Sequence, residues 1–76
     1  MNKQRRKTLQ ELYDIIVEAK DNLDEVRDEE ECYKDNMPEN LQNSERYERA
    51  CETVEALESA LSSLEEALDY IEEAKQ

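Results

Sequence analysis

Apolar residues recur at alternating steps of three and four in two long segments of the chain, and this spacing restricts the fold more than any other feature. The repeat averages 3.5 residues, which is the period of a coiled-coil seam, and it persists over several heptads in each segment. It predicts two long helices, each with one apolar stripe. One acidic residue, Glu30, interrupts the first stripe. The stripe residues are Leu9, Leu12, Ile16, Ala19, Leu23, Val26 and Tyr33 in the first segment, and Tyr47, Ala50, Val54, Leu57, Leu61, Leu64, Leu68 and Ile71 in the second.

A polar joint at residues 36–43 separates the two segments. Pro38 has no backbone N–H and disfavours helix at the residue before it. Three asparagines in the joint favour turns. Ser44, or Asn43 beside it, is the expected N-cap of the second helix.

The start of the first helix has two readings. Thr8 and Glu11 match the capping box S/T-x-x-E, so the helix begins at Thr8 or runs back into the basic segment before it. The expected division is a basic N-terminal segment at 1–7 and a single helical domain at 8–76, with helices at about 8–35 and 44–75.

The two stripes match each other as an antiparallel pair. Leu9 with Ile71 and Tyr33 with Tyr47 are the ends of a series in which the two residue numbers always add to 80. A chain folded back at the joint produces such a constant sum. The expected fold is therefore all-α, an antiparallel, coiled-coil-like hairpin of two helices.

Charges beside the stripes agree with this pairing. In an antiparallel pair the e positions of the two helices share one edge, and bases on the first helix then face acids on the second. The bases are Lys20, Arg27 and Lys34, and the acids are Glu58, Glu65 and Glu72.

The opposite edge carries small and apolar side chains that a two-helix hairpin cannot bury. One interpretation is that alanine serves there only as a good surface helix former. The other is a packing face for a partner helix, which we favour because a hairpin of 76 residues has a thin core. We then expect a homodimer that forms a four-helix bundle. The predicted interface residues are Ile15, Ala56, Ala60, Ser63, Ala67, Tyr70 and Ala74.

The chain is strongly acidic, with 22 Asp and Glu against 10 Lys and Arg and a net charge of −12. One outer column of the first helix is entirely Asp, and we interpret it mainly as a solvated face. Direct nucleic-acid binding is not expected, because the overall field repels phosphate. The basic segment is expected to be neutralised by acids at the end of the second helix. The acidic column consists of Asp14, Asp21, Asp28 and Asp35.

Missing residue types argue against catalysis. The chain has no His and no Gly, which excludes His-based catalytic pairs and phosphate-cradling loops. We expect no enzyme activity, no cofactor and no specific metal site.

Cys32 and Cys51 fall on opposite edges and are expected to be free thiols. No segment has the length or apolarity of a membrane span or a secretory signal, so a cytoplasmic location without membrane contact is expected.

The run PENLQNSERYE (38–48), followed by a helix rich in Ala, Leu and Glu, resembles the second half of short uncharacterised proteins of Gram-positive bacteria and their phages or mobile elements. The resemblance implies a small cytoplasmic helical protein of that origin and supplies no activity and no site residues.

Two functions stay open. One is a self-associating protein-interaction module of unknown partner. The other is an acidic mimic of nucleic acid that inhibits a DNA- or RNA-binding protein.

Overall fold

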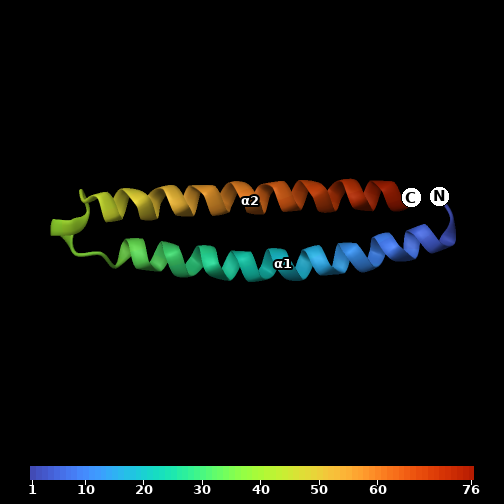
Figure 1. The fold of residues 1–76 in the computed structure, drawn as a ribbon, viewed down its shortest axis with the longest axis horizontal. Coiled ribbons are helices and arrows are strands. Elements are labelled where there is room, and N and C mark those ends of the chain that lie inside the picture. The colour runs from blue at the N-terminus through green and yellow to red at the C-terminus, as the bar shows by residue number, and fades with distance from the viewer.

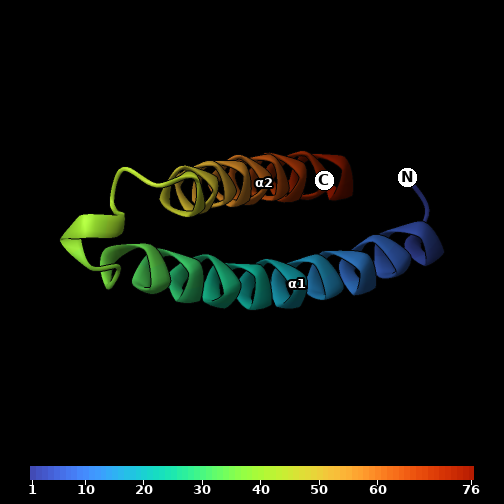
Figure 2. The same ribbon diagram turned by 60° about the vertical axis from the view of Figure 1, so that its left-hand side comes forward.

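The computed structural model describes all 76 residues as two long antiparallel helices joined by a short turn. Helix α1 spans Lys3–Asp35, the 3₁₀ helix η1 spans Glu39–Leu41, and helix α2 spans Glu45–Lys75. Figures 1 and 2 show α1 and α2 side by side along their length, with both chain ends at the same end of the molecule. The molecule measures 59 × 15 × 12 Å. The expected all-α antiparallel hairpin is therefore confirmed.

Helix α1 begins at Lys3, before the capping box considered at Thr8. The Asn2 side chain caps it by accepting a hydrogen bond from the Arg5 N–H at 2.8 Å. Thr8 lies inside the helix, where its hydroxyl donates to the Gln4 carbonyl at 3.1 Å and so is not a cap. The helix thus runs back into the basic segment, because Lys, Arg and Gln are good helix formers and Asn2 supplies a cap. A start near residue 8 is corrected to residue 3.

The turn follows the predicted chemistry with one unforeseen contributor. The Asn36 N–H still bonds to the Cys32 carbonyl at 2.9 Å, and the chain then leaves the helix before Pro38. Ser44 is the N-cap of α2, as expected, and its hydroxyl accepts from the Tyr47 N–H at 3.3 Å. Met37 is buried in the turn, although its neighbours in sequence are polar. A methionine in a polar joint therefore closes the apolar layer at this end.

Cross-helix contacts fix the register that the stripes predict. Lys20 lies 3.4 Å from Glu65, and Arg27 lies 3.9 Å from Glu58. In both pairs the residue numbers add to 85, which is the sum required of e positions when stripe residues add to 80. These two predicted ion pairs are confirmed. At the same sum Lys34 lies opposite Cys51 and Glu72 lies opposite Tyr13, so the third expected base and acid do not meet. Lys34 instead lies 3.8 Å from Asp35, and Glu72 lies 3.0 Å from Lys75.

The apolar layer between the helices is lopsided. Its buried side chains on α2 are Ala50, Val54 and Leu68, whereas α1 contributes no fully buried residue. The side of α1 turned toward α2 instead holds half-buried residues of the a and e positions. These are Leu9, Tyr13, Ile16, Lys20, Leu23, Arg27, Glu30 and Lys34.

The expected stripe of α1 is therefore corrected at its d positions. Leu12, Ala19, Val26 and Tyr33 are exposed rather than enclosed between the helices. Helix α1 is turned by about 50° from a symmetric seam, given 3.6 residues per turn. This rotation of α1 brings the bases at the e positions within reach of the acids on α2. The methylene stems of these bases then cover the part of the apolar layer that the d residues do not cover.

Candidate interaction face

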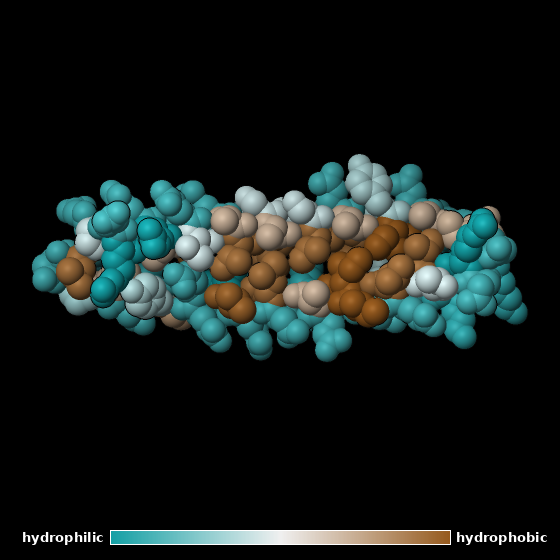
Figure 3. All heavy atoms as spheres, in the orientation of Figure 1, coloured by the Kyte–Doolittle hydropathy of each residue, from teal (hydrophilic) through white to brown (hydrophobic).

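Two helices together present one long apolar surface, which we call the open face. Helix α1 contributes its outward-turned d and g residues, and α2 contributes the small residues of its g and c positions. Figure 3 shows hydrophobic side chains gathered in a band along the two helices, with hydrophilic atoms along both outer edges. The open face consists of Leu12, Ile15, Ala19 and Val26 of α1, and Ala56, Ala60, Ser63, Ala67, Tyr70 and Ala74 of α2.

Exposure on the open face is high for side chains of this kind. Ile15 is 61% exposed and Tyr70 is 63% exposed, while Leu12 and Val26 retain 46% and 49%. Ala60 and Ala67 are half-buried beside them. Single exposed apolar residues are ordinary, but a contiguous apolar patch marks a contact surface.

The opposite side of the hairpin, the charged edge, consists of Lys20, Arg27, Glu58 and Glu65. The side chains of Lys20 and Arg27 are only 28% and 26% exposed. These bases are therefore better covered by the fold than Leu12 and Val26 are. Water solvates an ammonium or guanidinium group better than an aliphatic side chain. The isolated hairpin therefore exposes aliphatic side chains and covers charged ones, which is the less favourable distribution.

Arg27 is held by carboxylates from both helices. Its guanidinium lies 2.8 Å from Asp24, 3.0 Å from Asp28 and 3.9 Å from Glu58. The contact of Nε with Asp28 is short, but no hydrogen bond forms there. Burial lowers the pKa of Arg27, but the surrounding carboxylates outweigh it, and the pKa is held above its ordinary value. This arrangement fixes one side of the hairpin by charge.

A second polar contact closes the hairpin near the chain ends. The Lys75 ammonium donates to the Gln10 side chain and lies 4.9 Å from the centre of the Tyr13 ring. It also bonds to Glu72 at 3.0 Å. Glu72 lies opposite Tyr13 in this register, so its partner is Lys75 of its own helix rather than a base on α1.

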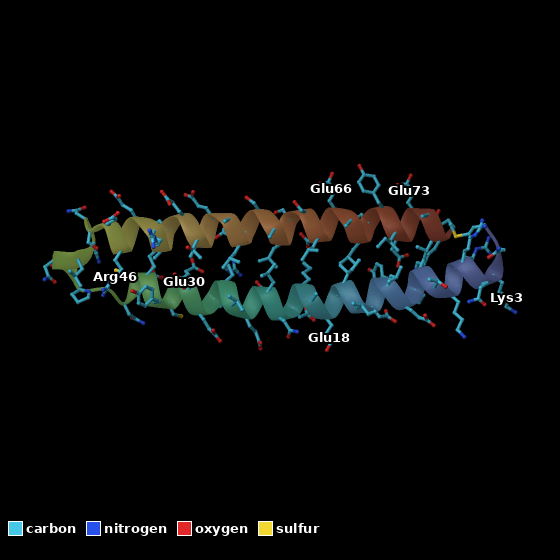
Figure 4. The ribbon with its side chains drawn as sticks, viewed as in Figure 1. Lys3, Glu18, Glu30, Arg46, Glu66 and Glu73 are labelled. Atoms are coloured by element: carbon cyan, nitrogen blue, oxygen red, sulfur yellow. The ribbon has the colours of Figure 1, made fainter.

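The acidic column of α1 is exposed along its length. Two of its members are partly neutralised, because Asp28 lies beside Arg27 and Asp35 beside Lys34. Asp14 accepts a hydrogen bond from Gln10 at 2.9 Å. Figure 4 shows acids on the outer sides of both helices, where Glu18, Glu66 and Glu73 point away from the hairpin. The acidic shell thus surrounds the open face without entering it.

Nothing in the fold forms an enclosed site. The hollows on the surface are shallow, lie along α2 alone and have polar walls; the largest is lined by Glu55, Glu58, Ser59 and Ser62. No group of three or more Asp, Glu or Cys residues has the geometry to hold a metal ion. Cys32 is exposed and Cys51 half-buried, and both are unpaired. Neither helix is long and apolar enough to cross a membrane.

Sequence reasoning found only part of the open face. It placed Ile15 and the small residues of α2 on one edge, and the structure brings these residues together there. It missed Leu12, Ala19 and Val26, because heptad spacing alone assigns d residues to the seam. The available signal was the row of long basic side chains at the e positions, which can cover a seam in place of d residues.

No family model, no curated protein and no solved structure matches this chain.

Proposed function

We propose that this protein is a non-enzymatic protein–protein interaction module that self-associates through the open face into a four-helix bundle. The observation that carries the proposal is the reversed pattern of exposure. The fold covers the stems of Lys20 and Arg27 and leaves Leu12, Ile15 and Val26 to solvent. A second layer of helices on the open face reverses that pattern, because it buries the apolar side chains and leaves the charged edge in water.

The dimensions of the hairpin suit such a contact. One side of the hairpin is 59 Å long and 15 Å wide, so an interface of the standard size, roughly 800 Å² from each partner, would extend from the open face over most of that side. Burying a large apolar side chain stabilises by about 1.5–3 kcal/mol relative to leaving it exposed. Several half-exposed side chains therefore contribute several such increments per subunit. Because a hairpin of 76 residues has a thin core, burial of these side chains in a dimer is its main further source of stability.

Sedimentation equilibrium at micromolar concentration tests the proposal. We expect a species of twice the 9.0 kDa chain mass. A single 9.0 kDa species over the whole concentration range would refute self-association. Far-UV circular dichroism on the same samples verifies that the chain is helical in either case.

The second candidate function is an acidic mimic of nucleic acid. The observation that favours it is the exposure of all four aspartates of the column on α1, at intervals of about 10.5 Å along the helix. A mimic captures a nucleic-acid-binding protein, releases it as salt rises and is displaced by DNA. A captured partner that withstands salt and ignores DNA favours the apolar open face instead.

A further inference from the structure

The open face is bulkier along α1 than along most of α2. Helix α1 presents Leu12, Ile15 and Val26, which project well beyond the backbone. Helix α2 presents mainly Ala and Ser across the same face, with Tyr70 near the chain ends as its one large side chain. A surface that is raised along one side and low along the other fits a partner with the opposite relief.

A second copy can cover this face about a twofold axis in two ways. If the axis is parallel to the helices, both turns lie at the same end, and α1 of each copy packs on the partner's α2. If the axis is perpendicular to the helices and lies in the plane of the interface, the turns lie at opposite ends. Helix α1 then packs on the partner's α1, and α2 on the partner's α2.

Side-chain size favours the arrangement with both turns at one end. Because that axis preserves height along the bundle, Leu12 and Ile15 lie level with the partner's Ala67 and the partner's Ser63. Val26 lies level with the partner's Ala56. Bulky residues then meet small ones at both contacts, and the helices stay evenly spaced. In the other arrangement bulky residues oppose bulky ones between the α1 helices, and the contact between the α2 helices holds small residues with Tyr70 as the exception. Even close packing is the lower-energy solution.

Charge at the rim of the face favours the same arrangement independently. The outer rim of α1 carries Glu11, Glu18 and Glu25, all exposed. With turns at opposite ends, this rim runs antiparallel beside the same rim of the partner, so that Glu18 of each copy meets the other and Glu11 lies level with the partner's Glu25. Rows of like charge at that spacing are destabilising.

With both turns at one end, the acidic rim of α1 instead lies beside the rim of the partner's α2. That rim contains no acid at its c positions, and it carries Arg49 near the turn, next to Arg46. Neither arginine forms an ion pair within the hairpin. Figure 4 shows Arg46 at the turn end of the molecule and Lys3 at the other end. Both arginines are thus free to face Glu29 at the turn end of the partner's α1.

We infer that two copies pair through their open faces about an axis parallel to the helices, with both turns at one end of the bundle and both basic N-terminal segments at the other. The inference rests on the proposed self-association and adds its orientation. The resulting assembly is polar along its length. One end carries Lys3, Arg5, Arg6 and Lys7 from each of the two chains, and acids line most of the outer surface between the ends.

Distances between spin labels at the turn test the orientation. The labelled protein is the full chain with Cys32→Ser, Cys51→Ser and Asn40→Cys, because Asn40 is exposed at the tip of the turn. With turns at one end, the two labels are separated by about 20–30 Å, a few helix spacings of 8–10 Å. With turns at opposite ends, their separation approaches the 59 Å length of the hairpin.

A matched label separates failure of the orientation from failure of self-association. Ser62→Cys in the same background lies near mid-height on α2, where both dimers give a short separation. Short distances at both sites support the inference. A short distance at residue 62 with a long one at residue 40 overturns the orientation and leaves the dimer standing. No dipolar coupling at either site, together with a 9.0 kDa species in sedimentation, overturns both proposals.

Discussion

The charged edge and the open face are two sides of one hairpin, and they meet water in opposite ways. On the charged edge, Lys20 and Arg27 pair with acids across the helices and are about three-quarters covered by the fold. On the open face, Leu12 and Val26 remain about half exposed. The same rotation of α1 produces both results. The ion pairs thus set the orientation of α1, while the apolar side chains are left for another surface to bury.

This difference indicates where the chain obtains stability and where it obtains specificity. Surface ion pairs contribute only about 0.2–1 kcal/mol each, so their role is to select register and rotation. Apolar burial contributes more per residue, and on the open face much of it is still available. Substitutions on the two sides should therefore have effects of different size and of different dependence on protein concentration.

The largest effect is expected from a charge in the middle of the open face. Ile15→Asp places a carboxylate where the dimer has no partner for it, and an uncompensated buried charge costs about 3–5 kcal/mol per subunit. We expect sedimentation to show a 9.0 kDa monomer at concentrations where the unaltered chain is a dimer. Ser62→Asp adds the same charge at an exposed position of α2 away from the open face and serves as the control. Equal dissociation by both variants would attribute the effect to net charge alone.

The next largest effect compares one leucine from each layer. Leu68 is buried between the helices, and Leu68→Ala should lower the free energy of unfolding by about 2–5 kcal/mol at every protein concentration. Leu12 is 46% exposed in the hairpin. Leu12→Ala should therefore destabilise mainly at high concentration, where the dimer buries that side chain. Urea unfolding at two concentrations measures both. A concentration-independent loss for Leu12→Ala would argue that the open face stays uncovered.

A smaller effect is expected at the helix caps. Ser44→Ala removes the hydroxyl that accepts from the Tyr47 N–H and should cost about 1 kcal/mol. Thr8→Ala removes no cap, because Thr8 lies within α1, and should change stability by no more than about 0.5 kcal/mol. Thermal unfolding compares the two. Equal losses would place the start of the stable part of α1 near residue 8.

The smallest effect is expected on the charged edge. Lys20→Gln removes the contact with Glu65 at 3.4 Å and should cost about 0.2–1 kcal/mol, decreasing as salt is added. Thermal midpoints at low and high salt measure the loss. A loss of several kcal/mol that persists in high salt would make the charged edge, rather than the apolar layer, the main source of stability.

Arg27 should leave the charged edge insensitive to alkaline pH. A base whose pKa is raised on folding contributes its full stability below its unfolded pKa and loses it only as pH rises through the folded value. The pKa of Arg27 is raised above its ordinary, already strongly basic value. Between about pH 7 and pH 10 the thermal midpoint should therefore show no loss from this residue. Arg27→Met should shift the midpoint by the same amount at both pH values.

The sequence predicts the charged edge more completely than the open face. The spacing of the stripes and the joint at Pro38 are local and periodic signals, so they give the hairpin, its register and the cap at Ser44. The rotation of α1 is a tertiary choice between d and e residues, and the heptad pattern is nearly indifferent to it. In the observed rotation Lys20 and Arg27 reach Glu65 and Glu58, a contact between the helices that the spacing of apolar residues does not encode.

Burial of Met37 was not predicted, and the sequence left the start of α1 open between Thr8 and the basic segment, for related reasons. A single methionine in a polar turn has no periodicity to reveal its burial. Asn2 and Thr8 are both residue types that can cap a helix, and the sequence alone does not show that Asn2 is the one used. Both outcomes depend on the contacts that a single residue makes in the folded chain, and residue spacing does not reveal such contacts.

Intermolecular contacts between methyl groups test most directly whether a second copy covers the open face. A mixture of ¹³C-labelled and unlabelled chains, recorded with isotope filtering, reports only contacts between subunits. We expect signals from the methyl groups of Leu12, Ile15 and Val26 to alanine methyl groups of the unlabelled chain. An absence of such signals from these three residues in a sample that sediments as a dimer would contradict the account.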